Sequence, residues 1–445
     1  MISKTFSKKE IILHNTKEDC WVILFNQVYD ISDFVKKHPG GAEILLSRAG
    51  EDASSFFQTR HGINSPYLKH LEKYKIGELY FEERVNKSAF DEPFLEELIK
   101  TCQRKNLFKV SQEDSKRFNS IRVLLVGIFF LIIVSVYYLN IQWWGALPLV
   151  VIQALISTSL FGLLAHEHTH NEFPKSKFLN LSLQFIWPIL WPFISRKALI
   201  YEHNSHHIKI GDPEYDYEVI AFSHFIRYSG DIPHRRIHKM QHQLSFVWYM
   251  FYANIITTIG GVFTSFWNQH NKKVALGHNI SVLLTFSVYF ILPMLLGFSF
   301  LSLLLYYLLF QCILFTFIYI GAAINHFTPL ANQPIPEEMK NKFGYYVCHN
   351  TSNFAPNSSF WFYFTGGFNI QIEHHLSAFV PVENLKKLQP IVKELCNKYQ
   401  YPYVEFNSMF DLYKAHYDYL YNLSKPELNS LSINEMDNKR GFQAR

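Results

Sequence analysis

Three short histidine groups have the residue spacing of a metal site. In HEHTH, His166 and His170 lie four residues apart, with His168 between them. HNSHH and QIEHH each place their polar side chains at positions i, i+3 and i+4. Residues at these separations share one face of a helix, so their side chains can converge on one ion. The residues that fit this spacing are His166, His170, His203, His206, His207, Gln371, His374 and His375.

These groups predict metal binding, and ligand type alone leaves iron, zinc and copper open. A single HxxxH pair is a weak signal, because paired histidines also form hydrogen bonds on helix surfaces. Three groups, each close to an apolar segment, favour a shared site. A further set, His234, His238 and His242, has helical spacing but lies in the basic stretch IPHRRIHKMQHQ. We expect that set to form a solvated amphipathic helix on the membrane surface.

Four apolar segments are long enough to carry the histidine groups on a membrane bundle. Residues 121–140 would form a helix of about 30 Å, the thickness of a bilayer core. Residues 146–165 follow a turn that contains two tryptophans, which suit the membrane interface. Residues 280–300 and 301–323 form a second close pair. The first group, HEHTH, directly follows the second of these segments, and Asn325-His326 follows the fourth.

Basic residues predict the orientation of the four segments. Lysine and arginine precede the first and third segments and follow the fourth, whereas the turns at 141–145 and near 298 have none. The positive-inside rule therefore places both turns in the lumen and the rest in the cytosol. Two other apolar stretches, 181–194 and 246–267, are predicted to be interfacial or re-entrant. If either one alone crossed the membrane, the histidine groups would lie on opposite faces.

Residues 8–80 are predicted to form a separate small domain. Residues 21–25 and 28–32 have the composition of short strands around a turn at Asn26-Gln27. HPGG then forces a tight turn that presents His38 at a loop tip, and His61 lies 23 residues further on. This segment resembles a cytochrome b5 domain through HPGG, the preceding strands and DASSFF before the second histidine. The resemblance implies that His38 and His61 are the two axial ligands of one b-type haem, which carries electrons.

Composition excludes some classes of protein. A formal charge of +5 over 445 residues is too small and too dispersed to indicate nucleic-acid binding. The five cysteines stand far apart and form no CxxC pair, so we expect them to be reduced and structural. The first forty residues have no signal-peptide pattern, which indicates a cytosolic N-terminal end.

The whole chain resembles the membrane-bound front-end fatty acyl desaturases, which include delta-5, delta-6 and sphingolipid delta-8 enzymes. The resemblance rests on the cytochrome b5-like front end, four spans, and the boxes HxxxH, HxxHH and QxxHH. Its most specific parts are FTGGFNIQIEHHL and HNSHH followed by GDPEYD. It implies two non-haem irons with ligands His166, His170, His203, His206, His207, His326, His374, His375 and Gln371. In that family the third box opens with glutamine, so Gln371 binds iron directly, binds through water, or orients a neighbour.

The implied reaction is oxygen-dependent desaturation of a long-chain acyl group, at delta-5 or delta-6. Electrons would pass from cytochrome b5 reductase through the haem to the iron pair, with O2 as co-substrate. The acyl chain, held as acyl-CoA or in a phospholipid, would lie in a dry tunnel that the apolar spans line. The alternatives are a sphingoid long-chain-base delta-8 desaturase, a lipid hydroxylase, and, from another class, a membrane-anchored haem electron carrier without a second site.

Several residues depart from the family pattern. Glu167 replaces the usual aspartate of the first box, His168 is extra, and SAFVP follows the third box in place of an aromatic-proline pair. Glu167 is either a partner to a metal-binding histidine or an ordinary surface carboxylate. These departures affect the expected substrate more than the expected reaction.

The predicted fold is a small α+β haem domain fused to an all-α membrane domain. The membrane domain would comprise four transmembrane helices, interfacial helices and a cytosolic helical cap. We expect a multi-pass protein of the endoplasmic reticulum whose haem domain and histidine boxes face the cytosol. The polar tail from Leu423 is predicted to be disordered. The predicted divisions are 8–80 haem domain, 81–120 linker, 121–400 desaturase domain and 401–445 C-terminal extension, partly disordered.

Overall fold

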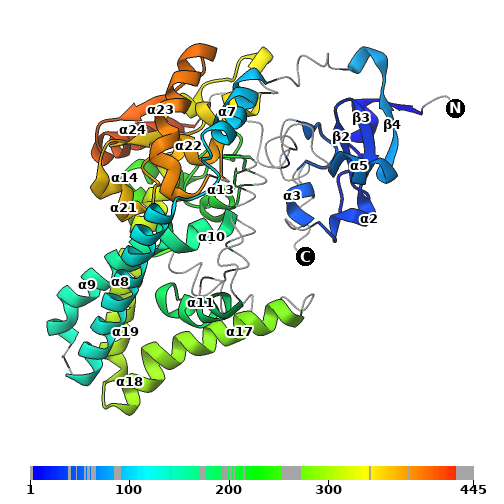
Figure 1. The fold of residues 1–445 in the computed structure, drawn as a ribbon. Coiled ribbons are helices and arrows are strands. Elements are labelled where there is room, and N and C mark those ends of the chain that lie inside the picture. Colours follow the sequence, from blue (N-terminus) through cyan, green and yellow to red (C-terminus); the bar gives the residue numbers. More distant parts are fainter. Residues whose placement is uncertain are drawn as a thin grey trace.

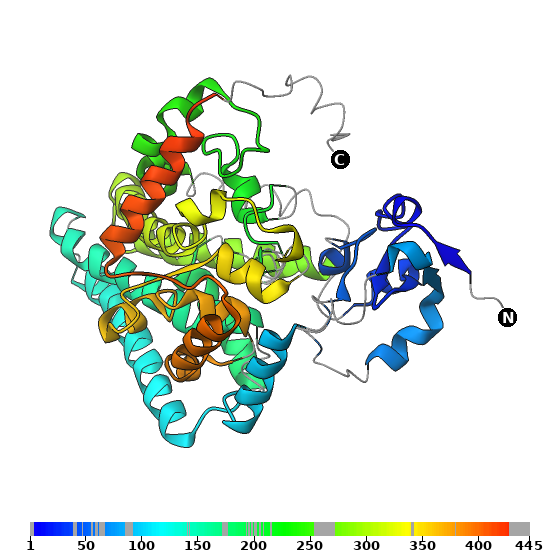
Figure 2. The ribbon, with the colours of Figure 1, turned by 90° about the horizontal axis from the view of Figure 1, so that it is seen from above.

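The fold consists of a small α+β domain and a larger, mostly helical domain that lie beside each other (Figures 1 and 2). This computed structural model describes residues 4–38, 42–46, 48–54, 57, 61, 67–84, 92–139, 141, 143–170, 177–192, 194, 196, 199, 203, 206–207, 209–213, 216–252, 272–339, 342–378 and 380–426.

A four-stranded sheet with the order β1-β4-β3-β2 forms the frame of the small domain. The predicted hairpin is present, but its turn is Phe25-Asn26, one residue earlier than predicted. Both turn residues have positive φ, as in the type I′ turns whose twist suits a two-residue hairpin. The strands are β1 (Thr5–Phe6), β2 (Trp21–Leu24), β3 (Gln27–Asp30) and β4 (Lys75–Leu79).

Short helices cover this sheet, and His38 and His61 of the predicted haem site lie between them in the chain. They are α1 (Lys8–Ile11), α2 (Ser32–Val35), α3 (Ala42–Leu46) and α5 (Tyr67–Leu71). Cys20, Val22 and Leu24 are buried with Tyr29 and Val35 in one apolar cluster beneath them. The tight turn predicted at Pro39, Gly40 and Gly41 lies outside the described residues.

Among the described residues, three helices are long and apolar enough to cross a membrane: Gln112–Tyr138, Trp144–His170 and Phe300–Gly321. They coincide with the first, second and fourth predicted spans. The third predicted span, 280–300, contains only a shorter apolar helix, Asn279–Leu295. The predicted count of four spans is therefore not confirmed. The elements concerned are α8 (Gln112–Tyr138), α9 (Trp143–Leu160), α17 (Lys272–Phe286), η7 (Ser287–Ile291), α18 (Leu292–Leu295) and α19 (Phe300–Ala323).

Apolar packing joins α8, α9 and α19 into a bundle, where Phe129, Leu160 and Phe310 are fully buried. The outer side of α8 leaves Val123 and Leu131 more than half exposed. An apolar outer face on a helix of this length is what a lipid environment accommodates. Figure 1 shows the helical hairpins projecting together from the remainder of the domain.

The two shorter apolar stretches are described only in part. Residues 181–194 fall mostly within α11 (Lys177–Leu190), which packs along α17. Of the stretch 246–267, the structure describes residues up to the end of η5 (Trp248–Tyr252), and the remainder lies outside the described residues.

A compact cap packs on one end of the bundle. It is mostly helical, although β5 (Ser352–Phe354) and β6 (Val404–Phe406) form a small parallel sheet, so the membrane-associated domain is not purely α-helical. Its helices are α7 (Pro93–Arg104), α13 (Tyr217–Phe222), α14 (Gln241–Val247), α20 (Phe343–His349), α21 (Ser359–Thr365), α22 (Gln371–Leu376), α23 (Val382–Tyr399) and α24 (Met409–Leu423).

The His234, His238 and His242 set packs into this cap, so the prediction of a solvated helix is wrong. His238 is fully buried, and His234 lies 2.9 Å from the Ser424 carbonyl. His242 contacts the rings of Tyr417 and Tyr421 on α24. His234 and His242 contact α24 and the residue that follows it, and the apolar face of α24 is buried in the cap.

Candidate metal centre

Five histidines from all three predicted boxes converge on one point. One ring nitrogen from each lies within 4.8 Å of the others. Nε2 of His203 lies 2.8 Å from Nε2 of His170 and 2.9 Å from Nε2 of His207. Nε2 of His207 is in turn 3.0 Å from Nε2 of His374. The five members are His166, His170, His203, His207 and His374.

A second group of three histidines adjoins the first. His206, His326 and His375 place their ring nitrogens within 4.8 Å of one another, and Nε2 of His206 lies 3.2 Å from Nε2 of His326. The rings of His207 and His375 stack at 4.0 Å and so connect the two groups. The chain thus brings eight predicted ligands into two neighbouring clusters.

These contacts fit a pair of bound transition-metal ions. Two nitrogens that each bind one ion at ~2.0–2.1 Å lie roughly 3 Å apart, which is the spacing seen between the Nε2 atoms here. His166 Nε2 and both ring nitrogens of His375 are buried without a hydrogen-bond partner among the described residues. Buried polar atoms are rarely left unsatisfied, so these atoms indicate a ligand.

A π-helical turn positions the first box. The helix that begins as α9 continues through η3 (Phe161–His166), which has π geometry and ends on His166. The short α10 (Glu167–His170) then carries His170. A π turn rotates the following residues relative to the preceding helix, and such turns are frequent at functional sites. The rings of His166 and His170 lie 5.2 Å apart as a result.

Close backbone contact brings the third box to the first. A Cβ on Gly162 would lie 2.1 Å from the Thr365 carbonyl oxygen, and one on Gly366 would lie 2.2 Å from the Gly162 carbon. Gly366 also has φ of +65°, which ends α21. Glycine at both positions lets the chain reverse, so that Phe368 meets His166 at 4.5 Å.

Asp216 holds the second box in place. His206 Nδ1 donates to Asp216 Oδ2 at 2.9 Å, and the same oxygen accepts from the Gly211 amide at 2.7 Å. With Nδ1 as the donor, His206 Nε2 keeps its lone pair for a metal. Asp216 was not predicted as a site residue, although its place in GDPEYD directly after HNSHH is a usable signal.

A carbonyl performs the same role for His326. His326 Nδ1 donates to the Asn350 carbonyl oxygen at 3.1 Å, which directs Nε2 toward His206. No sequence pattern marks this partner, because any residue supplies a backbone carbonyl.

Burial keeps most of these rings neutral. Burial, together with the neighbouring histidines, holds the pKa of His203 and His207 well below the usual value. Burial also lowers the pKa of His326 to about 3. For His206 burial acts in the same direction, but the charges of Asp216 and Glu218 outweigh it and raise its pKa to about 9. Neutral imidazoles are the form that binds metals.

The roles of Gln371, His168 and Glu167 were left open by the sequence, and the structure shows their surroundings. Gln371 begins α22, is 2% exposed, and its Oε1 has no hydrogen-bond partner among the described residues. His168 lies against Arg196 and is not part of the five-histidine group. Glu167 accepts from the Val382 amide at 3.3 Å and so contacts the start of α23.

The two histidines of the small domain face each other. The ring centroids of His38 and His61 lie 6.3 Å apart, which leaves room for one iron atom with an imidazole nitrogen on each side. Phe34 contacts His38 and Phe57 contacts His61, so apolar rings border the gap.

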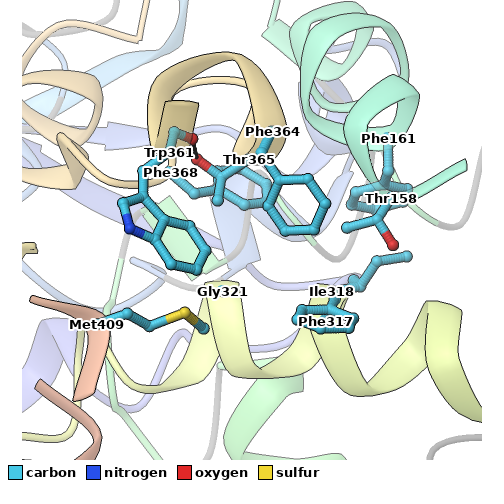
Figure 3. A pocket seen from close by; sticks show the side chains of 10 residues that line it. All are labelled: Thr158, Phe161, Phe317, Ile318, Gly321, Trp361, Phe364, Thr365, Phe368 and Met409. Carbon is cyan, nitrogen blue, oxygen red and sulfur yellow. Dashed lines mark hydrogen bonds between the residues drawn. The ribbon is translucent and has the colours of Figure 1, made fainter. Parts of the chain in front are cut away.

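An apolar hollow lies beside the first box (Figure 3). Side chains from α9, η3, α19 and α21 line it, and Met409 of α24 closes one side. Phe368 lines this hollow and also contacts the His166 ring, so the hollow adjoins the histidine groups.

A bundle of apolar helices with a buried histidine cluster at one end fits a membrane protein that could bind metal ions. Residues 141–407 match the family described as fatty acid desaturase, and residues 7–80 match the cytochrome b5-like heme/steroid binding domain. The chain belongs to the fatty acid desaturase family and carries a fused cytochrome b5-type domain. It is therefore an oxidoreductase that acts on lipid acyl chains.

Two similar proteins match this chain over nearly its whole length, and a third matches the small domain. A probable Delta(5) fatty acid desaturase C of Dictyostelium discoideum is 26% identical, over 96% of this chain and 97% of that protein. The Delta(5) fatty acid desaturase A of the same organism is 25% identical, over 94% of each. The cytochrome b5 of Drosophila melanogaster is 40% identical over 20% of this chain and 67% of that protein.

Proposed function

We propose that this chain introduces a double bond into a long-chain fatty acyl group by front-end desaturation. The observation that carries the proposal is the convergence of eight histidines, in two adjoining groups, next to an apolar hollow. We assign one iron to each group, with Gln371 as a further ligand or orienting residue.

In the proposed reaction, two adjacent methylene groups, one O2, two electrons and two protons give one double bond and two water molecules. Bound iron would supply the activation of O2. Around it, Asp216 and the Asn350 carbonyl hold His206 and His326 with Nε2 directed at the metal. The histidines are buried, so water is excluded from the site.

The haem of the small domain is the proposed source of both electrons. His38 and His61 would hold the haem through their imidazole nitrogens, and a haem held by two histidines would supply electron transfer. A cytochrome b5 reductase would reduce it after each transfer.

The hollow of Figure 3 is the proposed site for part of the acyl chain. Its lining is aromatic and aliphatic, and methylene groups gain free energy when apolar walls remove them from water. Phe368 stands between the hollow and His166, so a chain that rests on this ring passes close to the metal site.

We rank the delta-5 position first and delta-6 second. The printed names of two relatives along the whole chain specify delta-5, and their identities of 25% to 26% leave delta-6 and sphingoid delta-8 activity as outcomes of the test. The proposed setting is the endoplasmic reticulum, with the haem domain and the histidine groups on the cytosolic side.

Expression in a host that lacks polyunsaturated lipids tests the proposal. Defined fatty acids are supplied, and double-bond positions in the products are read by mass spectrometry. We expect a new double bond between an existing one and the carboxyl end. A hydroxylated product, a sphingoid product, or no product while the haem spectrum is normal would contradict it.

A further inference from the structure

The small domain meets the helical domain through a defined ion pair. Lys209 Nζ lies 3.2 Å from Glu51 Oε1, although the two residues are 158 positions apart in the chain. We infer that this contact is a docking surface that holds the haem domain against the second histidine box. The inference rests on the proposed function, since it assigns the contact to electron delivery.

The position of Lys209 makes the contact informative. Lys209 is two residues beyond His207, and its side chain is only 10% exposed. A buried ammonium group is costly unless a negative charge lies near it, and the haem domain supplies one. The Lys209 carbonyl accepts from the Asp212 amide, within the turn that Asp216 also holds.

The haem-domain side of the contact is rigid. The Glu51 carbonyl accepts from the Ile23 amide of β2 at 3.0 Å, and the Glu51 amide donates to the Arg48 carbonyl. Arg48 also pairs with the second carboxylate oxygen of Glu51 at 3.4 Å. Glu51 is therefore attached to the central sheet of the domain, so its position reports the position of the whole domain.

Tyr346 of α20 supports the segment that carries Lys209. Its hydroxyl donates to the Ile210 carbonyl at 2.6 Å. Burial raises the pKa of Tyr346, and the positive charge of Arg48 on the small domain acts in the opposite direction. Opposite charges meet across the surface at Lys209 and Glu51. In Figure 1, α3 lies on the side of the small domain that faces the helical domain.

The step that this surface would serve is a one-electron transfer. The haem that His38 and His61 would hold would give up one electron per docking event to the metal held by the histidine groups, and two such transfers would balance the formation of one double bond. Complementary charges across an interface favour formation of the correctly oriented complex.

Charge reversal tests the surface with the complete holoenzyme. The haem is pre-reduced, the protein is mixed with oxygenated buffer and acyl substrate, and haem reoxidation is followed by stopped-flow absorbance. Lys209→Glu and Glu51→Lys should each slow reoxidation about tenfold, and the double reversal should restore most of the rate. Glu18→Lys, which makes the same charge change on an exposed part of the haem domain, should leave the rate unchanged. A double variant as slow as the singles, or an equally slow control, would overturn the inference.

Cross-linking tests whether the two domains dock, independently of whether the chain forms a desaturated product. Cysteines introduced as Glu51→Cys and Lys209→Cys should be joined within one chain by a short bismaleimide, whereas Glu18→Cys with Lys209→Cys should not. Peptide mass spectrometry detects the link without any acyl product. A link in a chain that desaturates nothing would support docking and refute the proposed function. Product without a link would refute docking alone.

Discussion

At the scale of single residues, the histidines of this site depend on the atoms behind them. His206 and His326 each donate through Nδ1, one to a carboxylate and the other to a carbonyl. These partners set which nitrogen faces the metal and how each ring is turned. The histidines follow from their spacing, but their partners come from loops that approach only after folding.

Replacement of Asp216 by asparagine should weaken iron binding about 10- to 100-fold, because His206 loses its charged partner. Iron content after dialysis against a graded series of chelator concentrations measures this change. Asp231→Asn, on an exposed loop, is the matched control and should bind iron normally. Unchanged iron retention in Asp216→Asn would mean that this carboxylate does not position the ligand.

Glu92 predicts a pH dependence of stability. Burial raises its pKa from 4.5 to about 7, despite hydrogen bonds from the Gly344 amide and the Tyr401 hydroxyl. The folded chain therefore keeps this proton at pH values where the unfolded chain has lost it. The resulting stabilisation is complete below pH about 4.5 and is lost as the pH rises to about 7.

Urea unfolding in detergent at pH values from about 5 to about 7 should show the free energy of unfolding falling as the pH rises. Glu92→Gln should flatten that trend, since glutamine does not titrate. Glu96→Gln, on the same helix but with a side chain that is 42% exposed, should keep the wild-type slope. If Glu92→Gln kept it too, the Glu92 side chain would not hold its proton as described.

At the scale of elements, two features bring the first and third boxes together. One is the contact between Gly162 and Gly366, and the other is a buried ion pair. Arg122 of α8 pairs with Glu383 of α23 at 3.0 Å and donates through Nε to the Leu163 carbonyl at 2.8 Å. It thus ties the π-helical turn that ends on His166 to two other helices.

Loss of Arg122 alone should destabilise the fold by about 3–5 kcal/mol, because it leaves the Glu383 charge buried without this partner. The double variant Arg122→Met with Glu383→Leu should recover much of that loss. Thermal unfolding in detergent compares the single and double variants. Equal destabilisation of the two would indicate that packing, and not the charge pair, holds these helices.

Sequence pattern predicted some elements well and others poorly. Helical spacing identified seven of the eight histidines that the structure brings together, because that spacing survives in any helix. The eighth, His326, has no such spacing and was predicted only from the family resemblance. The hairpin turn was displaced by one residue, since strand composition does not fix where φ becomes positive. The burial of His238 was missed because its local sequence is basic, and only the folded cap removes it from water. The π-helical turn has no sequence signature.

At the scale of the whole molecule, a membrane bundle, a cap and a haem-type domain meet around one site. The bundle supplies the hollow and the first box, the cap supplies the third box, and the segment after the second box contacts the haem domain. Figure 2 shows the small domain at one flank of the helical domain.

Metal content tests the central claim most directly. Purified protein should contain about three irons per chain, one in haem and two at the histidine groups. His207→Ala should lower the non-haem iron while the haem spectrum is unchanged. One iron per chain in the unaltered protein, or full iron retention in His207→Ala, would contradict a shared histidine metal centre.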